Sequence, residues 1–168
     1  AMKEILKGLH DFRSNLFLRD RELYLKLAKA QNPSTLFISC SDSRVVPALM
    51  TQTSPGNLFE LRNAGNMVPA FGASNGGEAA TVEFAVGGLN VKDIIICGHT
   101  QCGAMKAMLD PKQMETMPLV RQWLEHAETT RRIMAENYPH LSAEHRLNVA
   151  VQEHVLIQVE NIQTHPAV

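Results

Sequence analysis

The first thirty residues place apolar side chains among charged ones with the 3.6-residue period of an α-helix. Ile5 and Leu9 fall on one helical face, and Leu23 and Leu27 show related spacing further along the chain. The triplet Asn-Pro-Ser then interrupts the pattern, because proline cannot continue a helix. We therefore predict helical structure over residues 3–30.

Three short apolar runs follow, at residues 35–39, 58–61 and 93–97. Apolar runs of this length, bounded by turn residues, are typical of β-strands. The first and the third run lack an alternating polar face. This favours strands that helices cover on both sides of a sheet.

The segment between the second and the third run, residues 74–89, predicts a helix. Asn75 can cap its first turn, and Glu78 stands three residues on, where its side chain can bond back to the cap. The resulting order of strand, helix and strand favours parallel strands.

The remaining chain predicts two long helices, at residues 117–137 and 142–163. Pro139 separates them, and Ser142 can cap the second. The fold class that follows is α/β, with a central, mostly parallel β-sheet flanked by helices, an N-terminal helical arm and C-terminal helices. We expect a single domain over residues 1–168, because a chain of 168 residues with 45% hydrophobic content can bury one core.

Composition narrows the class of partner. A net charge of −1, without a long basic stripe, gives no electrostatic reason to expect nucleic acid or a membrane surface. The N-terminus lacks the continuous apolar stretch of a secretory signal, and no apolar run approaches the ~20 residues that span a bilayer. These features favour a cytoplasmic protein with a small-molecule substrate.

Unusual chemistry follows two of the predicted strands. Cys40, Asp42 and Arg44 come at the end of the first, and His99 and Cys102 come after the third. The carboxyl ends of parallel strands meet at one edge of a sheet, so we expect these five side chains to converge if the two strands are neighbours. Two thiolates and one imidazole suit Zn²⁺, and three protein ligands leave a fourth tetrahedral position for water or substrate.

Other reactive residues have simpler interpretations. Cys97 lies inside an apolar run, where a free cysteine behaves as a small buried hydrophobe. Arg62 suits a structural ion pair and a substrate-side role equally well. Surface or interhelical packing is the expected role of the remaining histidines, which are His10, His126, His140, His145, His154 and His165.

Two motifs, Cys-Ser-Asp-Ser-Arg at 40–44 and Gly-His-Thr-Gln-Cys-Gly at 98–103, resemble those of the β-class carbonic anhydrases. The likeness extends to residues 61–69 and 76–86. The resemblance implies a zinc lyase that hydrates CO2 reversibly to bicarbonate and a proton through a zinc-bound hydroxide. It also implies a homodimer or a higher even oligomer.

Roles for single residues follow from the same resemblance. Cys40, His99 and Cys102 match the ligands of one Zn²⁺ per chain, and Asp42 and Arg44 match the catalytic Asp-Arg dyad of the family. In this arrangement Asp42 accepts a hydrogen bond from the hydroxide while Arg44 holds the carboxylate off the metal. Released from Arg44, Asp42 can become the fourth metal ligand of a closed state.

The resemblance also implies a substrate pocket. Its members are Gln31, which plant-type relatives send from a neighbouring subunit, together with Phe59, Ala64, Phe84 and Gly103. Phe37 stands where members with a bicarbonate-regulated closed site carry tryptophan, which favours the plant-like group with an open site. Relatives usually continue past residue 168 into a further strand with a tryptophan-rich motif, so the C-terminal strand region is expected to be missing here.

Two alternative functions remain open from the residues. A relative on the same scaffold can hydrolyse CS2 or COS, because zinc hydroxide attacks any such linear electrophile. A second alternative is a catalytically silent interaction protein whose zinc is closed by Asp42.

Overall fold

The computed structural model describes residues 1–74 and 76–168. The chain divides into two compact units, residues 1–32 and residues 33–168. A single domain over the whole chain stays a prediction. Among the described residues, no helix combines the length and the apolar character needed to cross a bilayer.

The first unit is helical, as its apolar period predicts. Helix α1 (Met2–Asp11) runs through a π-helical turn (Phe12–Leu16) into α2 (Phe17–Arg19), and α3 (Arg21–Leu27) follows a break at Asp20. None of these four elements contains a buried residue. The rings of Phe12, Phe17 and Tyr24 pack on one another with centroids 5.1–6.3 Å apart.

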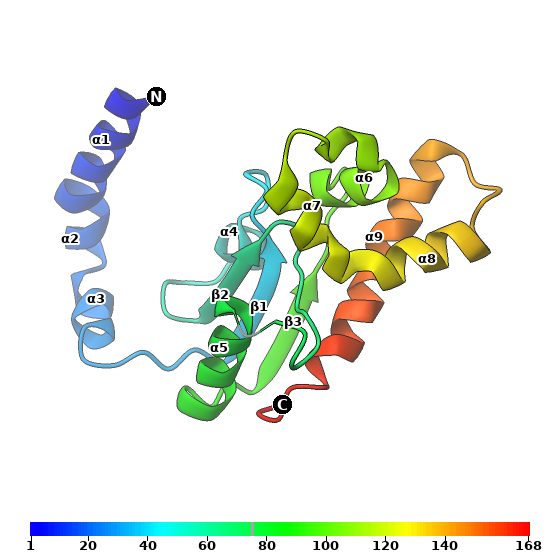
Figure 1. Cartoon of the computed structure of the whole chain (residues 1–168). Coiled ribbons are helices and arrows are strands. Elements are labelled where there is room, and N and C mark those ends of the chain that lie inside the picture. The colour runs from blue at the N-terminus through cyan, green and yellow to red at the C-terminus, as the bar shows by residue number, and fades with distance from the viewer. Residues whose placement is uncertain (75) are drawn as a thin grey trace. The chain divides into compact units, whose positions relative to one another are not determined.

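The second unit is built on a three-stranded parallel sheet with the order β2-β1-β3. Strand β1 (Thr35–Cys40) lies in the centre, between β2 (Leu58–Asn63) and β3 (Asp93–Cys97), as Figure 1 shows. The three predicted strands and their parallel direction are therefore confirmed.

Strand β3 is less buried than the pattern predicts. All six residues of β1 are buried, whereas Asp93 and Ile95 in β3 are exposed. The expectation that helices cover β3 on both sides is wrong, because the apolar side chain of Ile95 is 42% exposed. In the part of the chain that the structure describes, β3 is also an edge strand. An apolar run alone does not distinguish an edge strand from a central one.

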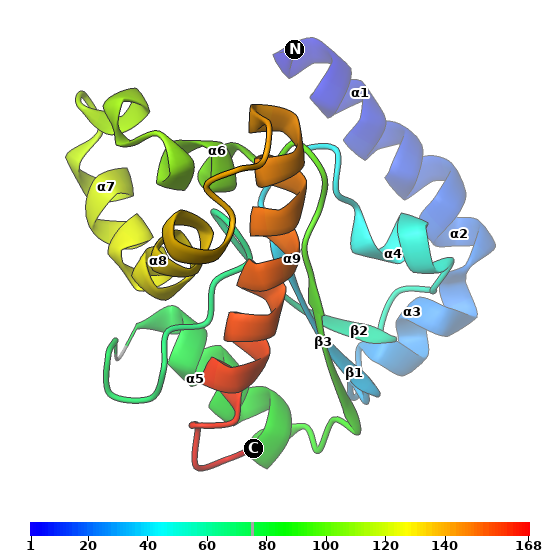
Figure 2. The ribbon, with the colours of Figure 1, turned by 90° about the vertical axis from the view of Figure 1, so that its right-hand side faces the viewer.

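Helices surround this sheet. In Figure 2, α5 and α9 lie on one side of the strands and α4 lies on the other. The helical elements are α4 (Pro47–Thr51), α5 (Gly77–Glu83) with a π-helical extension (Phe84–Gly88), α6 (Gly103–Leu109), a 3₁₀ turn (Pro111–Met114), α7 (Pro118–Leu124), a second 3₁₀ turn (Glu125–Ala127), α8 (Glu128–Asn137) and α9 (Ala143–Ile162).

Several predicted helix boundaries can be compared with these elements. Helix α5 begins after Gly76, and the proposed cap Asn75 lies outside the described residues. The long helix predicted at 117–137 is two helices joined by a 3₁₀ turn. Ser142 does cap α9, since its hydroxyl accepts a hydrogen bond from the backbone N–H of His145.

Two apolar clusters make up the core. One lies between the sheet, α5 and the end of α9, and it includes Leu36, Ile38, Val82 and Ile162. The other fills the space between α6, α7, α8 and α9 with many methionines, and it contains Cys40 and Cys102. The cysteines at the end of β1 and the start of α6 therefore lie where the sheet meets the helical cluster.

A row of polar side chains on and just after α9 holds the segment that follows β2. The hydrogen bonds join His154 to Gly65, Gln158 and Asn161 to Val68, and His165 to Pro69, with donor and acceptor 2.7–3.0 Å apart. The interhelical role expected for His154 is confirmed, since its Nδ1 lies 3.1 Å from the hydroxyl of Thr130 on α8. The surface role is wrong for both His154 and His165. Both are buried and donate to carbonyl oxygens of a loop, which would otherwise be left without partners.

Burial of His154 makes stability depend on pH. The side chain is 1% exposed, and burial lowers its pKa to about 4. Because the unfolded value is about 6.5, the unfolded chain gains the extra proton first as the pH falls. The free energy of unfolding should therefore decrease between about pH 6.5 and 4, by at most about 1.4 kcal/mol per pH unit from this group.

Urea unfolding at pH 7 and pH 5 tests this prediction. We expect the wild-type protein to lose more stability between the two pH values than His154→Gln, which has no group titrating in this range. Equal losses in both proteins would contradict the assignment of the neutral imidazole to the folded state.

Candidate metal centre

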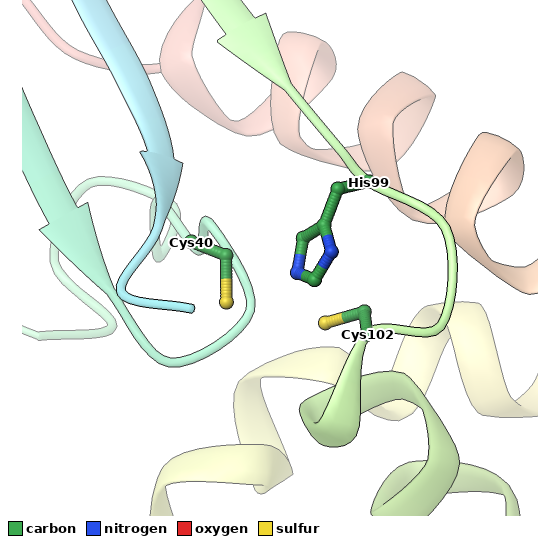
Figure 3. Close-up of side chains that lie close together, drawn as sticks. All are labelled: Cys40, His99 and Cys102. Atoms are coloured by element: carbon green, nitrogen blue, oxygen red, sulfur yellow. The ribbon is translucent and has the colours of Figure 1, made fainter. Parts of the chain in front are cut away.

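Three side chains converge at the carboxyl edge of the sheet. Cys40 ends β1, His99 follows β3, and Cys102 is the N-cap of α6. Their ligand atoms all lie within 4.8 Å of one another, and Figure 3 shows the two thiols and the imidazole ring facing a common space. The convergence follows from the parallel pairing of β1 with β3, which puts both strand ends at one edge.

The backbone between β3 and α6 has an unusual path. Gly98 runs so close to α9 that a Cβ there would lie 2.8 Å from a methyl group of Val155 and 2.9 Å from one of Val151. Gln101 adopts the left-handed conformation, with φ of 57°. A strained residue of this kind persists only when the surrounding structure holds it.

The imidazole is prepared to bind a metal. His99 Nδ1 lies 2.9 Å from the carbonyl oxygen of Thr100 and donates its hydrogen there, so Nε2 keeps its lone pair. Within the described residues, Nε2 is buried and has no hydrogen-bond partner. Buried polar atoms are rarely left unpaired. A nitrogen left this way beside two sulfur atoms fits Zn²⁺, which takes Cys and His ligands.

The two thiols shift each other's pKa in opposite directions. Hydrogen bonding with Cys102 is the largest cause that lowers the pKa of Cys40, and together with the Gly65 N–H it brings this pKa to about 4 against the opposing effect of burial. The same pairing and burial raise the pKa of Cys102. The opposite shifts describe a coupled pair that loses its first proton easily and its second with difficulty. A bound cation would favour loss of both protons.

Asp42 and Arg44 form a tight pair beside the cluster. Arg44 donates from Nε and from its backbone N–H to Oδ1 of Asp42 at 2.9 and 3.0 Å, and from Nη2 to Oδ2 at 2.7 Å. The guanidinium holds the pKa of the Asp42 carboxyl well below its usual range. Oδ2 lies 3.8 Å from His99 Nε2. The carboxylate is therefore ionised, close to the three ligand atoms and held by arginine.

Arg62 has a role that neither sequence interpretation describes. Its guanidinium donates to the carbonyl oxygens of Cys40, Asp42 and Val45 at 2.7–3.2 Å. The register of the sheet explains this reach, since Arg62 lies opposite Ser39 on the neighbouring strand. Among the described residues Arg62 forms no ion pair, so that interpretation is corrected to a structural tie that holds the loop after β1. The substrate-side role stays a prediction.

Cys97 lies outside the cluster. Its side chain is half-buried, its sulfur contacts the carbonyl oxygen of Gly98 at 3.5 Å, and burial raises its thiol pKa. The interpretation as a packing residue agrees with these contacts, and the cysteine offers a natural control for the two ligand cysteines.

The expected pocket residues lie in different surroundings. The rings of Phe59 and Phe84 pack with centroids 5.9 Å apart, and Gly103 begins α6. Ala64 lies on the wall of a surface cavity of about 350 Å³ together with Trp123. Gln31 belongs to the first unit, residues 1–32. Their substrate contacts stay a prediction.

Sequence reasoning missed three residues behind the ligands. Gly65 N–H lies 3.4 Å from Cys40 Sγ, and His154 and Trp123 hold the carbonyl groups on either side of that N–H. The nearest signal in the sequence was a histidine in the middle of a long predicted helix. This signal does not name the loop that the histidine contacts.

Comparison with known proteins agrees with this geometry. Residues 35–168 match the family model of carbonic anhydrases. The structure of the β-carbonic anhydrase CcaA superposes with a TM-score of 0.97 at 48% identity, over 99% of this chain and 75% of that one. The chain belongs to the β-class carbonic anhydrases. The resemblance noted from the two motifs is confirmed, and so is the α/β fold.

Two further comparisons with carbonic anhydrases give similar results. The carbonic anhydrase of Synechococcus elongatus is 46% identical over 99% of this chain, which spans 62% of the length of that relative. Tetrameric β-carbonic anhydrases from Sordaria macrospora superpose with a TM-score of 0.88 at 26% identity, over 99% of this chain and 82% of theirs.

The cluster predicts which cysteines retain zinc. Cys40→Ser and Cys102→Ser each replace a soft thiolate with a hydroxyl, and we expect each to retain less than about a tenth of the wild-type zinc after dialysis. Cys97→Ser should retain one zinc per chain. Elemental analysis of the purified proteins measures the ratio, and equal zinc in all three variants would show that the metal binds elsewhere.

Proposed function

We propose that this β-carbonic anhydrase catalyses the reversible hydration of CO2 to bicarbonate and a proton. The observation that carries the proposal is an ionised Asp42, held by Arg44, beside a cluster of three side chains that could hold a metal ion. Membership of the family supports the reaction. The zinc ligands Cys40, His99 and Cys102 and the dyad Asp42 and Arg44 are the site residues of the proposal.

Zn²⁺ held by these three ligands would supply Lewis-acid chemistry, since it lowers the pKa of a water molecule in its remaining position and so provides a nucleophile for CO2. Two thiolates and a neutral imidazole cancel the charge of the ion. The chain must therefore contribute further polarisation through the residues around that position.

Asp42 provides the acceptor. An ionised carboxylate can only accept hydrogen bonds, so Asp42 would accept one from a water molecule beside it and would orient that water toward CO2. Arg44 occupies both carboxylate oxygens and thereby prevents Asp42 from becoming a fourth metal ligand. This arrangement corresponds to the open state of the site.

The remaining parts of the proposal concern the substrate pocket and assembly. The packed rings of Phe59 and Phe84 offer an apolar surface suited to CO2. Ala64 and Gly103 lie within the sequence motifs of the family, and they complete the proposed pocket.

We also propose a homodimer or a higher even oligomer in which Gln31 reaches the site of a neighbouring copy. The tetrameric relatives and the lack of buried residues in the helices of residues 1–32 support assembly. A cytoplasmic location is part of the same proposal.

Stopped-flow CO2 hydration by zinc-quantified protein tests the reaction. We expect turnover that rises from neutral to alkaline pH and disappears when zinc is removed, because the nucleophile requires a deprotonated water. Protein that holds one zinc per chain and shows no turnover at any pH would overturn the proposed function.

Arg44→Ala tests the dyad. Loss of the guanidinium frees Asp42, so we expect the variant to retain zinc while CO2 hydration falls by about 10- to 100-fold. Arg131→Ala is the matched control, because Arg131 makes a similar two-point pair with Glu128 on the exposed surface of α8. Undiminished hydration by zinc-loaded Arg44→Ala would contradict the role of the pair.

A further inference from the structure

The loop after β2 brings a backbone donor to a metal ligand. Gly65 N–H lies 3.4 Å from Cys40 Sγ, and both residues are buried. Gly65 has φ of +86°, and a Cβ at this position would lie 3.0 Å from Cβ of Ala104 on α6. The position therefore requires glycine. Glycine is also the residue with the greatest backbone freedom, so its N–H keeps one direction only if other groups hold it.

Trp123 holds the peptide group that carries this N–H. The carbonyl oxygen of Ala64 and the N–H of Gly65 belong to one planar trans peptide and point in opposite directions. Nε1 of Trp123, on α7, donates to that oxygen at 2.8 Å. A hydrogen bond at one end of a peptide group also polarises it and strengthens the donor at the other end.

His154 holds the next peptide group. The carbonyl oxygen of Gly65 can only accept, so Nε2 of His154, 2.9 Å away, carries the hydrogen. Nδ1 must then accept, and the hydroxyl of Thr130 on α8 lies 3.1 Å from it. His154 and Thr130 are 1% and 0% exposed, so water does not compete for either bond.

We infer that His154 and Trp123 are positioning residues that fix the two peptide groups around Gly65, so that its N–H donates to Cys40 Sγ and draws negative charge from that thiolate. A thiolate that accepts a hydrogen bond donates less charge to a bound metal. The arrangement therefore favours a more electrophilic metal in a site whose two thiolates already neutralise it. The low pKa of the buried imidazole keeps His154 in the neutral form, whose Nε2 donates.

Co²⁺ substitution tests the inference without turnover. The absorption of a thiolate-to-Co²⁺ charge-transfer band moves to lower energy when the sulfur loses a hydrogen bond. We expect this red shift in His154→Leu. We also expect a zinc dissociation constant about tenfold or more above the wild-type value in competition with a chelator, because Cys40 Sγ loses a group that holds it in position, and this outweighs its stronger charge donation. His154→Gln retains a donor amide at nearly the same reach, so its band and zinc affinity should return to wild-type values.

His165→Leu is the matched control. His165 is also buried and donates from Nε2 to a carbonyl of the same loop at 2.9 Å, but that carbonyl belongs to Pro69, four residues beyond Gly65. We expect no shift of the band and wild-type zinc affinity. An equal shift in His165→Leu would overturn the inference, because it would show that loosening of the whole loop is sufficient.

Trp123→Phe gives a second test that does not depend on how His154→Leu folds. Trp123 is only half-buried, and phenylalanine keeps the ring while removing the donor to Ala64. The same red shift is expected. Wild-type spectra in both His154→Leu and Trp123→Phe, or a shift in His154→Gln as large as in His154→Leu, would overturn the inference.

The inference rests on the metal site of the proposed function, but it does not rest on the reaction. A wild-type protein that binds neither Co²⁺ nor Zn²⁺ would remove both. A wild-type protein that binds metal with a spectrum unaffected by His154→Leu and Trp123→Phe would remove the inference alone and leave CO2 hydration to be judged by its own assay.

Discussion

The parallel pairing of β1 with β3 is the constraint on which the site depends. It places Ser39 opposite Cys97, so the two strands end at the same edge of the sheet and at the same height. Cys40 is the last residue of β1, and His99 follows β3 after a single glycine. Without this register, ligands separated by about sixty residues in the chain would not meet. The register of the sheet, more than the conformation of any loop, therefore brings the zinc ligands together.

The loops that leave the sheet must then be held without the help of regular structure. Arg62 binds the loop after β1 through its carbonyl groups, and the polar row on and after α9 binds the loop after β2. The bonds from α9 satisfy backbone groups that burial would otherwise leave unpaired. The side chains that support the site therefore bond mainly to backbone atoms, and these bonds fix the path of the chain.

The charged groups beside the cluster come from a short stretch of the chain. Asp42 and Arg44 are only two residues apart, so one short turn provides both the carboxylate and the group that restrains it. On the other side, the neutral His154 acts through Gly65 and adds no charge to the core. A charged partner in that position would need compensation in the apolar interior, whereas a neutral imidazole needs only its two hydrogen bonds.

The sequence by itself determined the strands, most of the helices, and the residues of the metal cluster and the dyad. Apolar periods placed the strands and most helices, and the Cys-x-Asp-x-Arg and His-x-x-Cys spacings identified the metal cluster, because ligands and the dyad must be close in the chain at each strand end. Only the tertiary structure decided that β3 lies at an edge, that Arg62 binds carbonyl groups and that His154 reaches Gly65. These contacts join residues far apart in sequence, and a local pattern of apolar and polar positions carries no information about which distant backbone groups a side chain will meet.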